Sequence, residues 1–399
     1  MLIMKFGGSV LKDIAGFQSM LSIVQAYKNE KLLIVISALD ISTRILSKAL
    51  LITSQGLLEQ AQELILQLIE KHRVLAETLF SDSKGYDAYI ELLDNHKKRL
   101  FKILHGVSIT KEISGRVQDL FISHGELLAL ECVHHFIESH SIQHSLIDAR
   151  EIIITDNRFG SARPYREFTK QHVQDTLLPL FNHNNILITH GFIASDEQGN
   201  TTTMGTESSN LTASLLGSLL PASEIIIWTD IEGIRNSDPK YIENTQCIRN
   251  MSYQQAERLA NQGLKVIHVS MLEDPSKSGI PVTIKSAFNP NGEYTTISHQ
   301  ENTSLQIMIN IAHNEQRYFV LPDEVLNKNK NNIQLLIIQS SHPSIKEALI
   351  HRMSNDYSPD ISCAISYYAD VHLVWGNKIY IDTLQMNLFN NFLHEESIL

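Results

Sequence analysis

The first residues that could do chemistry are Lys5, Gly7, Gly8 and Ser9, in the segment KFGGS. Glycines allow backbone N–H groups to approach an anion closely and to point inward around it. Lys5 adds a compact positive charge, and a helix expected from residue 13 would direct its positive end to the same place. These features suit the phosphates of a nucleotide, although an ordinary strand-to-helix turn has similar glycines. The chain has no GxxxxGK[ST] loop, so this is not a Walker A site.

Three further groups could serve the same chemistry. The segment 202–210 (TTMGTESSN) is rich in hydroxyls and precedes a predicted helix, which favours an anion site or a set of helix caps. Thr229 and Asp230 end a predicted strand, where they could meet a ribose or base, and Lys240 could meet a phosphate. Lys265 starts another predicted strand. Two lysines and two anion-binding loops are what phosphoryl transfer requires, because that reaction depends on positioning and charge neutralisation.

Short apolar segments that alternate with helical patterns would position these residues. We predict strands over 2–6, 31–37, 152–154, 186–189, 225–228, 266–269 and 281–285, and helical segments over 13–28, 43–80, 115–138 and 209–219. This alternation indicates an α/β fold with a doubly wound, mostly parallel sheet. Such sheets bind ligands beyond the carboxyl ends of their strands.

The composition changes near residue 299, where a polar segment has the character of a linker. We therefore predict two domains, a large α/β domain over 1–298 and a small α+β module over 303–399. Within the module we predict strands over 304–310, 316–320, 333–338, 361–367, 371–375 and 378–382, and a helix over 343–353.

The composition excludes several classes of protein. A hydrophobic content of 43% in 399 residues excludes a disordered chain. No apolar run approaches the ~20 residues of a transmembrane helix, and the N-terminus lacks the pattern of a signal peptide. The net charge of −11 argues against a nucleic-acid surface, and three widely spaced cysteines form no disulfide framework. We expect a soluble, cytoplasmic protein that binds neither nucleic acid nor membrane.

A group of histidines is the remaining candidate for a metal site. Cys132, His134, His135, His140 and His144 are close together in the sequence. Adjacent histidines on an amphipathic helix are more often surface residues than ligands. We therefore predict no protein-bound metal site.

Together with several shorter motifs in the same order, these groups resemble the aspartokinases of the amino-acid kinase family. The matching motifs are KFGGS (5–9), VISAL (35–39) with Thr43, SHGE (123–126), DAR (148–150), FGSA (159–162), GFIAS (191–195), TTTMG (201–205), WTDIEGI (228–234), SDPK (237–240) and GLKVIH (263–268). Ten motifs in register are far more specific than one glycine loop. The resemblance covers roughly residues 1–298. It implies the amino-acid kinase fold, a homo-oligomer such as a homodimer, and ATP- and Mg²⁺-dependent phosphorylation of the aspartate β-carboxylate.

The resemblance also implies a role for each matching residue. Lys5 and Lys265 would be catalytic, with Lys5 stabilising the charge of the transferring phosphoryl group. Nucleotide contacts would come from Gly7, Gly8, Ser9, Thr229, Asp230, Arg235 and Lys240. Substrate contacts would come from Thr43, Arg44, Glu126 and Ser209. Glu126 would meet the substrate amino group.

The sequence departs from the family at the loop that reads GRGGSD in aspartokinases. Thr206 replaces the arginine that clamps the substrate α-carboxylate, Glu207 replaces a glycine, and Asn210 replaces the final aspartate. If an α-carboxylate is still bound, another cation must replace the missing arginine, because losing a bidentate arginine contact is not a conservative change. The candidates are Arg44, Arg150, Arg158, Arg163 and Arg166, of which we favour Arg44 or Arg163.

Smaller departures leave other readings open. Arg44 stands where the family has asparagine, and Arg235 where it usually has tyrosine. Residues 303–399 are too few for the two ACT modules common in aspartokinases, so we expect one reduced, ACT-like module. One alternative is a kinase of the same fold that acts on a different amino-acid-like carboxylate. Another is a nucleotide-binding homologue without catalytic activity.

Overall fold

The computed structural model describes residues 1–205, 208–235, 245–261, 264 and 267–302, and the backbone of four strands between residues 309 and 375. The chain divides into two units. One comprises Met1–Ile231 with Ser270–Gly292, and the other Glu232–Val269 with Glu293–Leu399. The domain division at 298 and 303 stays a prediction.

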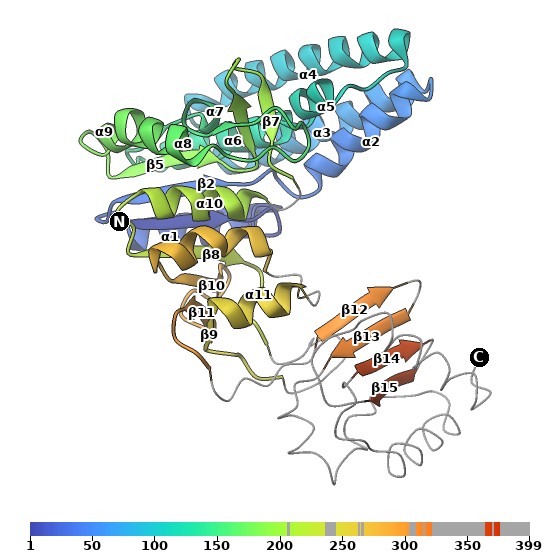
Figure 1. Ribbon diagram of the computed structural model, residues 1–399. Helices are drawn as coiled ribbons and strands as arrows, with labels where there is room; N and C mark the ends of the chain where they lie inside the picture. Colours follow the sequence, from blue (N-terminus) through green and yellow to red (C-terminus); the bar gives the residue numbers. More distant parts are fainter. Residues whose placement is uncertain are drawn as a thin grey trace, which may run out of the picture. The chain divides into compact units, whose positions relative to one another are not determined.

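The first unit is built on a parallel sheet with the strand order β3-β5-β2-β1-β8-β10 (Figure 1). These strands are Ser145–Leu146 (β3), Ile186–His190 (β5), Leu32–Ile36 (β2), Leu2–Phe6 (β1), Glu224–Thr229 (β8) and Val282–Ser286 (β10). Most of their residues are apolar and buried, as expected for parallel strands that are covered on both faces. The predicted α/β class with a mostly parallel sheet is confirmed.

Helices of the first unit cover both faces of this sheet. They are Ile14–Ala26 (α1), Ser42–Ser54 (α2), Leu58–Phe80 (α3), Gly85–Thr110 (α4), Gly115–Ile122 (α5), His124–Ser139 (α6), Ala149–Ile152 (α7), Arg166–His172 (α8), Leu178–Leu180 (α9), Ser208–Leu219 (α10) and Glu273–Ser278 (α12), with a π-helical turn at Val173–Leu177. The predicted helical segments 43–80 and 115–138 correspond to α2 with α3 and to α5 with α6. We did not predict α4, although its buried residues recur at helical spacing: Tyr89, Leu93, His96, Leu100, Leu104 and Val107.

Alternate strand residues contribute to two cores, one on each face of the sheet. Met4, Ile34 and Ile188 belong to the larger core, which residues of α1 to α6 complete. On the other face, a Cβ on Gly217 of α10 would lie 2.7 Å from the side chain of Ile225. Glycine therefore lets α10 lie close against the sheet.

A separate three-stranded sheet in the first unit contains β4 (Ile154–Thr155), β6 (Ile193–Asp196) and β7 (Thr201–Thr203). β4 is parallel to β6, whereas β6 and β7 are antiparallel. The strand predicted over 152–154 is wrong in its start, because Ile152 ends α7 and the strand begins at Ile154. Asp148 explains the difference, since its side chain accepts a hydrogen bond from the Arg150 N–H (2.9 Å) and caps α7.

The second unit contains a parallel pair of strands and an antiparallel sheet. The pair is β9 (Asn250–Ser252) and β11 (Tyr294–Ser298), and α11 (Tyr253–Asn261) follows β9. The antiparallel sheet contains, in order, Ile309–His313 (β12), Gln316–Val320 (β13), Ala364–Tyr368 (β14) and Val371–Trp375 (β15). These strands agree with the predictions at 316–320 and 371–375 and overlap those at 304–310 and 361–367.

One further strand prediction is wrong, and three other predicted elements lie outside the described residues. The strand predicted over 266–269 is wrong in its described part, because Val269–Met271 forms a 3-10 turn. Ile267 is only 3% exposed, so this apolar residue is buried in an irregular segment. A short apolar run does not show whether it is buried in a strand or in such a segment. The strands predicted at 333–338 and 378–382 and the helix at 343–353 lie outside the described residues.

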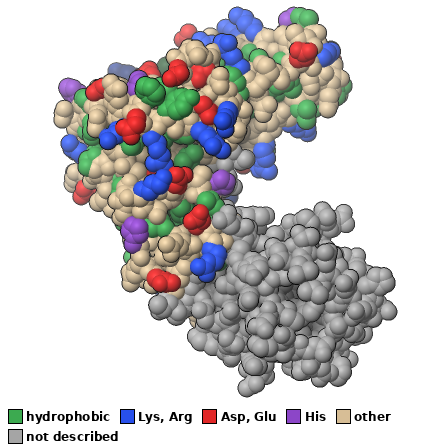
Figure 2. All heavy atoms as spheres, viewed as in Figure 1, with side chains coloured by type: hydrophobic (Ala, Val, Ile, Leu, Met, Phe, Trp, Pro, Cys, Tyr) green, Lys and Arg blue, Asp and Glu red, His purple; other side chains and the backbone are tan. Residues whose placement is uncertain are grey.

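Among the described residues, every helix is too short or too polar to cross a bilayer. In Figure 2, lysine, arginine, aspartate and glutamate side chains are mixed over the visible face of the described part. This face therefore presents charges of both signs.

Candidate active site

The carboxyl ends of the central strands meet at one edge of the sheet. Phe6 at the end of β1 pairs with Ile36 of β2 and with Trp228 of β8, and Ile36 pairs with His190 of β5. The segments that follow these strand ends therefore begin side by side. This edge is where parallel α/β sheets bind ligands.

Lys5, Gly7, Gly8 and Ser9 form the segment at the end of β1. A Cβ on Gly7 would lie 3.3 Å from the Lys5 ammonium nitrogen and 3.8 Å from the Ser9 hydroxyl, so both groups gather around this glycine. A Cβ on Gly8 would lie only 2.7 Å from the Ala38 carbonyl oxygen. Gly8 thus permits the loop after β2 to approach, and the structure brings together the four groups expected around a phosphate.

Thr229 and Asp230 lie next to this loop, at the end of β8. The Thr229 hydroxyl donates a hydrogen bond to the Asp230 carboxylate (3.1 Å), and Asp230 is exposed. Trp228, just before them, stacks on Phe6 with ring centroids 6.1 Å apart. The Gly7 N–H donates to the Trp228 carbonyl oxygen (3.3 Å), which holds the end of β8 beside the glycine loop.

Three more residues predicted for ATP lie in the second unit or outside the described residues. Arg235 lies in the second unit, where its guanidinium donates to the Thr245 hydroxyl (2.5 Å) and carbonyl oxygen and pairs with Glu293 (3.3 Å). Lys240 and Lys265 are outside the described residues. The roles of all three in nucleotide binding or catalysis stay predictions.

Glu126 is a buried carboxylate in the first turn of α6. It is 3% exposed, and burial raises its pKa to about 8 against the opposing effect of the backbone N–H groups of Glu126 and Ala38. Its Oε2 atom has no hydrogen-bond partner among the described residues. Because Ala38 also packs against Gly8, this carboxylate lies beside the glycine loop. A buried carboxylate with one free oxygen is suited to a cationic ligand group.

Thr43 and Arg44 lie in the first turn of α2, which follows the same loop. The Ser42 hydroxyl donates to the Leu39 carbonyl oxygen (2.5 Å) and closes the turn. A Cβ on Gly125 would lie 3.7 Å from the Ser42 Cβ, so the first turns of α2 and α6 pack together. Thr43 is half-buried and Arg44 is exposed.

Three of the five candidate arginines already have acidic partners. They are Arg150 with Asp148 (2.5 Å), Arg158 with Asp156 (3.5 Å), and Arg166 with Asp274 and Glu273 (3.7 Å). Arg44 and Arg163 are exposed and form no ion pair within the described part of the chain. The preference for Arg44 or Arg163 as the replacement cation is consistent with this and stays a prediction.

Ser209 lies in the first turn of α10, against the residue that follows β5. A Cβ on Gly191 would lie 2.7 Å from the Ser209 Cα, so glycine is required for this approach. Asn210 is 8% exposed, and its side-chain oxygen has no hydrogen-bond partner among the described residues. Thr206 and Glu207, the altered loop residues, are outside that part of the chain.

A sequence profile described as the amino acid kinase family matches residues 1–286. The chain belongs to the amino acid kinase family. Lysine-sensitive aspartokinase 3 of Escherichia coli is 31% identical to it over 215 residues, which cover 52% of this chain and 48% of that protein. The aspartokinase of Chlamydia muridarum is 27% identical over 305 residues, or 76% of this chain and 65% of that protein. The chain thus spans less than two thirds of the length of these relatives.

A solved structure extends this comparison to the fold. The crystal structure of E. coli aspartokinase III in complex with lysine and aspartate matches this amino acid kinase with a TM-score of 0.70 and 24% identity. The match covers 100% of this chain and 83% of that chain. The two proteins therefore share a fold.

In this amino acid kinase, Asp119 of α5 joins two motifs that are distant in sequence. Its carboxylate accepts hydrogen bonds from the N–H groups of Gly160 (2.9 Å) and Thr203 (2.7 Å) and from the Thr203 hydroxyl (2.9 Å). Burial raises the pKa of Asp119, and these bonds oppose that rise. Asp119 thereby ties the FGSA and TTTMG segments to α5. Nothing in the local sequence pattern distinguishes it from a surface aspartate.

Two pairs involving histidine lie in the same unit, and neither was predicted. His190 Nε2 at the end of β5 lies 3.1 Å from the Asp148 carboxylate. Burial alone would raise the pKa of Asp148, but hydrogen bonds and charges from His190 and Arg150 hold it well below its usual range. His124, which begins α6, lies 2.6 Å from His96 of α4 between their Nδ1 atoms. Burial lowers the pKa of His96 to about 4 and of His124 to about 3, so both are neutral near pH 7.

Proposed function

We propose that this chain phosphorylates the β-carboxylate of L-aspartate with ATP and forms 4-phospho-aspartate, the first step toward lysine, threonine and methionine. The observation that carries this proposal is the buried Glu126 carboxylate beside the loop that packs on Gly8, with one oxygen that has no hydrogen-bond partner among the described residues. Such a carboxylate suits the ammonium group of an amino acid, and the glycine loop suits phosphates. The aspartokinases of E. coli and C. muridarum, which the chain resembles, support aspartate as the amino acid.

In the proposed reaction, a β-carboxylate oxygen of aspartate attacks the γ-phosphorus of ATP. The bond between that phosphorus and the bridging oxygen breaks, and ADP leaves with the electron pair. The Lys5 ammonium, which lies with the Ser9 hydroxyl around Gly7, neutralises charge on the phosphoryl oxygens. Glu126 binds the substrate ammonium and orients the β-carboxylate. Lys265 is the proposed second catalytic lysine.

Mg²⁺ would accompany the nucleotide. This ion usually keeps several waters and is bound by phosphate oxygens with one or two carboxylates. Asp230 is an exposed carboxylate beside the glycine loop and fits that requirement. The ion would neutralise phosphate charge when bound.

We also propose that the enzyme works in the cytoplasm as a homodimer that binds neither nucleic acid nor membrane. The excess of acidic residues, with a net charge of −11, supports the absence of a nucleic-acid partner. Light scattering of the purified chain would test the dimer. Its expected mass is twice the 45.1 kDa of one chain.

A panel of amino acids incubated with ATP tests the function directly. The expected result is ADP formation with aspartate, together with an acyl phosphate that hydroxylamine traps. Turnover with another amino acid but not with aspartate would favour a kinase of the same fold with a different substrate. ATP binding without any turnover would favour a non-catalytic homologue.

The altered loop is the specific feature that favours the different-substrate alternative. Because Thr206 replaces the clamp arginine, aspartate activity in the wild-type chain requires another cation. Arg44→Ala and Arg163→Ala each test one candidate. Removing the arginine that binds the α-carboxylate should raise the KM for aspartate roughly 100-fold. Restoring the family loop with Thr206→Arg and Glu207→Gly gives a second test. If this change creates aspartate activity from almost none, the natural substrate is a different compound.

A further inference from the structure

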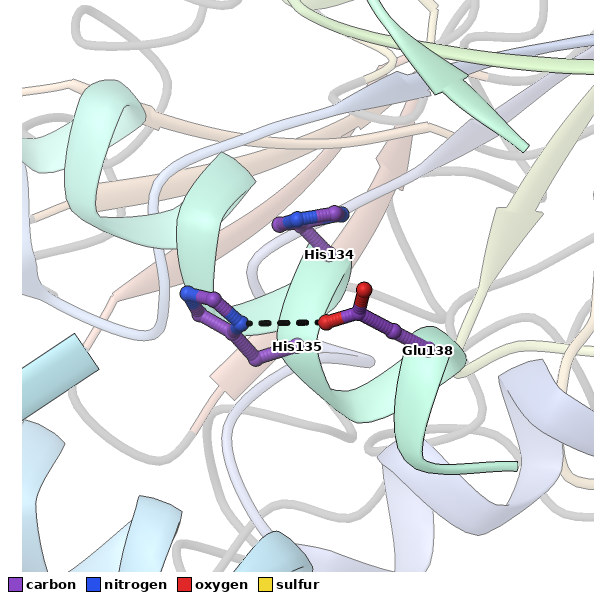
Figure 3. A group of neighbouring side chains, drawn as sticks. All are labelled: His134, His135 and Glu138. Carbon is purple, nitrogen blue, oxygen red and sulfur yellow. Dashed lines mark ion pairs between the residues drawn. The ribbon is translucent and has the colours of Figure 1, made fainter. Parts of the chain in front are cut away.

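The C-terminal half of α6 carries three potential metal ligands. His134, His135 and Glu138 each offer a ligand atom, and these atoms lie within 4.8 Å of one another (Figure 3). Glu138 is four residues after His134 and three after His135, so the helix brings the carboxylate next to both rings. The His135 side chain is only 10% exposed, which differs from the surface position predicted for these histidines.

The spacing between His135 and Glu138 fits two ligands of one ion. His135 Nδ1 lies 3.5 Å from Glu138 Oε2, and this nitrogen is buried without a hydrogen-bond partner among the described residues. A hydrogen bond between these groups would be shorter. Two ligands bound tetrahedrally to Zn²⁺ at 2.0–2.1 Å lie about 3.3 Å apart. The observed distance of 3.5 Å is therefore closer to the separation of two ligands of one ion than to the length of a hydrogen bond.

Neighbouring groups orient the His134 ring for metal binding. His144 Nδ1 lies 2.8 Å from the Ile142 carbonyl oxygen, and a carbonyl only accepts, so this nitrogen carries the proton. His144 Nε2 is then an acceptor, and His134 Nδ1 donates to it across 2.8 Å. His134 is left with a lone pair on Nε2. Metal-bound histidines commonly donate their other N–H to such a partner.

Packing holds the His135 ring in place and leaves the site open on one side. A Cβ on Gly85, the first residue of α4, would lie 2.4 Å from His135 Nδ1. The α4 backbone therefore lies directly against this ring. The Glu138 side chain, by contrast, is 59% exposed, so the carboxylate of the group is accessible from solvent.

We propose that His134, His135 and Glu138 bind one divalent transition-metal ion, for which Zn²⁺ is the best match. Two imidazoles and one carboxylate suit zinc, with water as the fourth ligand. All three ligands belong to the C-terminal half of α6, so the ion stabilises this end of the helix. The first turn of the same helix carries Glu126. The site does not depend on the proposed kinase activity.

Calorimetric titration of the full chain with Zn²⁺ alone tests the site, after removal of metals and in the absence of nucleotide. The wild-type chain is expected to bind one equivalent saturably. Glu138→Gln should weaken binding more than 10-fold, and His134→Ala should do the same. His105→Ala, which removes an exposed histidine of α4, is the matched control and should leave affinity unchanged. Circular dichroism of the metal-free variants checks that they are folded.

Two further measurements separate a built site from incidental histidine binding. His144→Ala keeps all three ligands and should still weaken Zn²⁺ binding roughly 10-fold, because His134 loses its orienting partner. At a hundredfold excess of free Zn²⁺ over its Kd, the melting temperature should rise by roughly 5 °C in wild type but not in Glu138→Gln. The absence of saturable binding, or equal affinity in Glu138→Gln and His105→Ala, would overturn the proposal.

Discussion

The nucleotide side and the substrate side of the candidate site are built in different ways. On the nucleotide side, backbone geometry dominates, because Gly7 and Gly8 allow close approaches and Asp230 is exposed. On the substrate side, Glu126 and Asn210 are buried with polar atoms that lack hydrogen-bond partners in the described part of the chain. The first arrangement needs only space and backbone N–H groups. The second places buried polar atoms where a bound ligand can supply the hydrogen bonds that the described residues do not.

This difference indicates what each side contributes. A backbone loop binds phosphates whatever the acceptor is, so it is compatible with many substrates. A buried carboxylate without a partner selects a cationic group at one position, so it determines which substrate fits. Substitutions on the two sides should therefore affect different kinetic constants.

The largest effect is expected for Lys5→Ala on the nucleotide side. Removing the ammonium from its place around Gly7 should lower kcat by roughly 10³-fold, because its charge matters most in the transition state. The melting temperature should stay the same. Lys12→Ala, which removes an exposed lysine seven residues later, is the control and should keep full activity. Unchanged turnover in Lys5→Ala would remove the proposed catalytic role.

Glu126→Gln is the corresponding test of the substrate side. Glutamine cannot ionise when the substrate ammonium binds, so this change should raise the KM for the amino acid roughly 100-fold and leave the KM for ATP nearly unchanged. Steady-state kinetics with each substrate varied in turn measures both constants. An equal rise in both would mean that Glu126 supports the whole site instead of binding the amino group.

Gly8→Ala tests whether the two sides are coupled through the loop after β2. The new Cβ would lie 2.7 Å from the Ala38 carbonyl oxygen and must displace this loop, whose Ala38 N–H also contacts Glu126. We expect kcat/KM to fall roughly 10-fold for both substrates. Gly106→Ala is the matched control, because a Cβ there would meet nothing within 4 Å. A change confined to ATP would show that the sides act independently.

The last test concerns stability and pH. The pKa of Glu126 rises from 4.5 to about 8 on folding, so the folded protein keeps a proton that the unfolded chain releases. The contribution of Glu126 to the free energy of unfolding should therefore be greatest below about pH 4.5 and should decline as the pH rises toward about 8. Glu126→Gln lacks this titration, so its melting temperature should fall less between about pH 5 and about pH 8.5. Thermal unfolding without ligands measures this, and parallel curves for the two proteins would contradict the assignment.

Local patterns in the sequence were sufficient for much of the fold and for the nucleotide side. The apolar strands β1, β2 and β8 and the helix after Gly7–Ser9 follow from periodicity and from the conformational freedom of glycine. These depend on residues close in sequence, so they can be recognised without the fold. The same reasoning failed at 152–154 and 266–269, because a short apolar run is buried equally well in a strand, a helix end or a turn.

Tertiary structure alone decided how the substrate side is assembled. Sequence similarity pointed to Glu126, but its burial and free oxygen depend on α6 packing against the loop after β2. Asp119 contacts Thr203 across 84 positions of the chain, and His96 meets His124 across 28. Such contacts arise when distant helices and strands pack around one core, and the pKa of each group follows from that burial. The sequence by itself thus determined which residues are available for chemistry, and packing determined which of them meet and in what charge state.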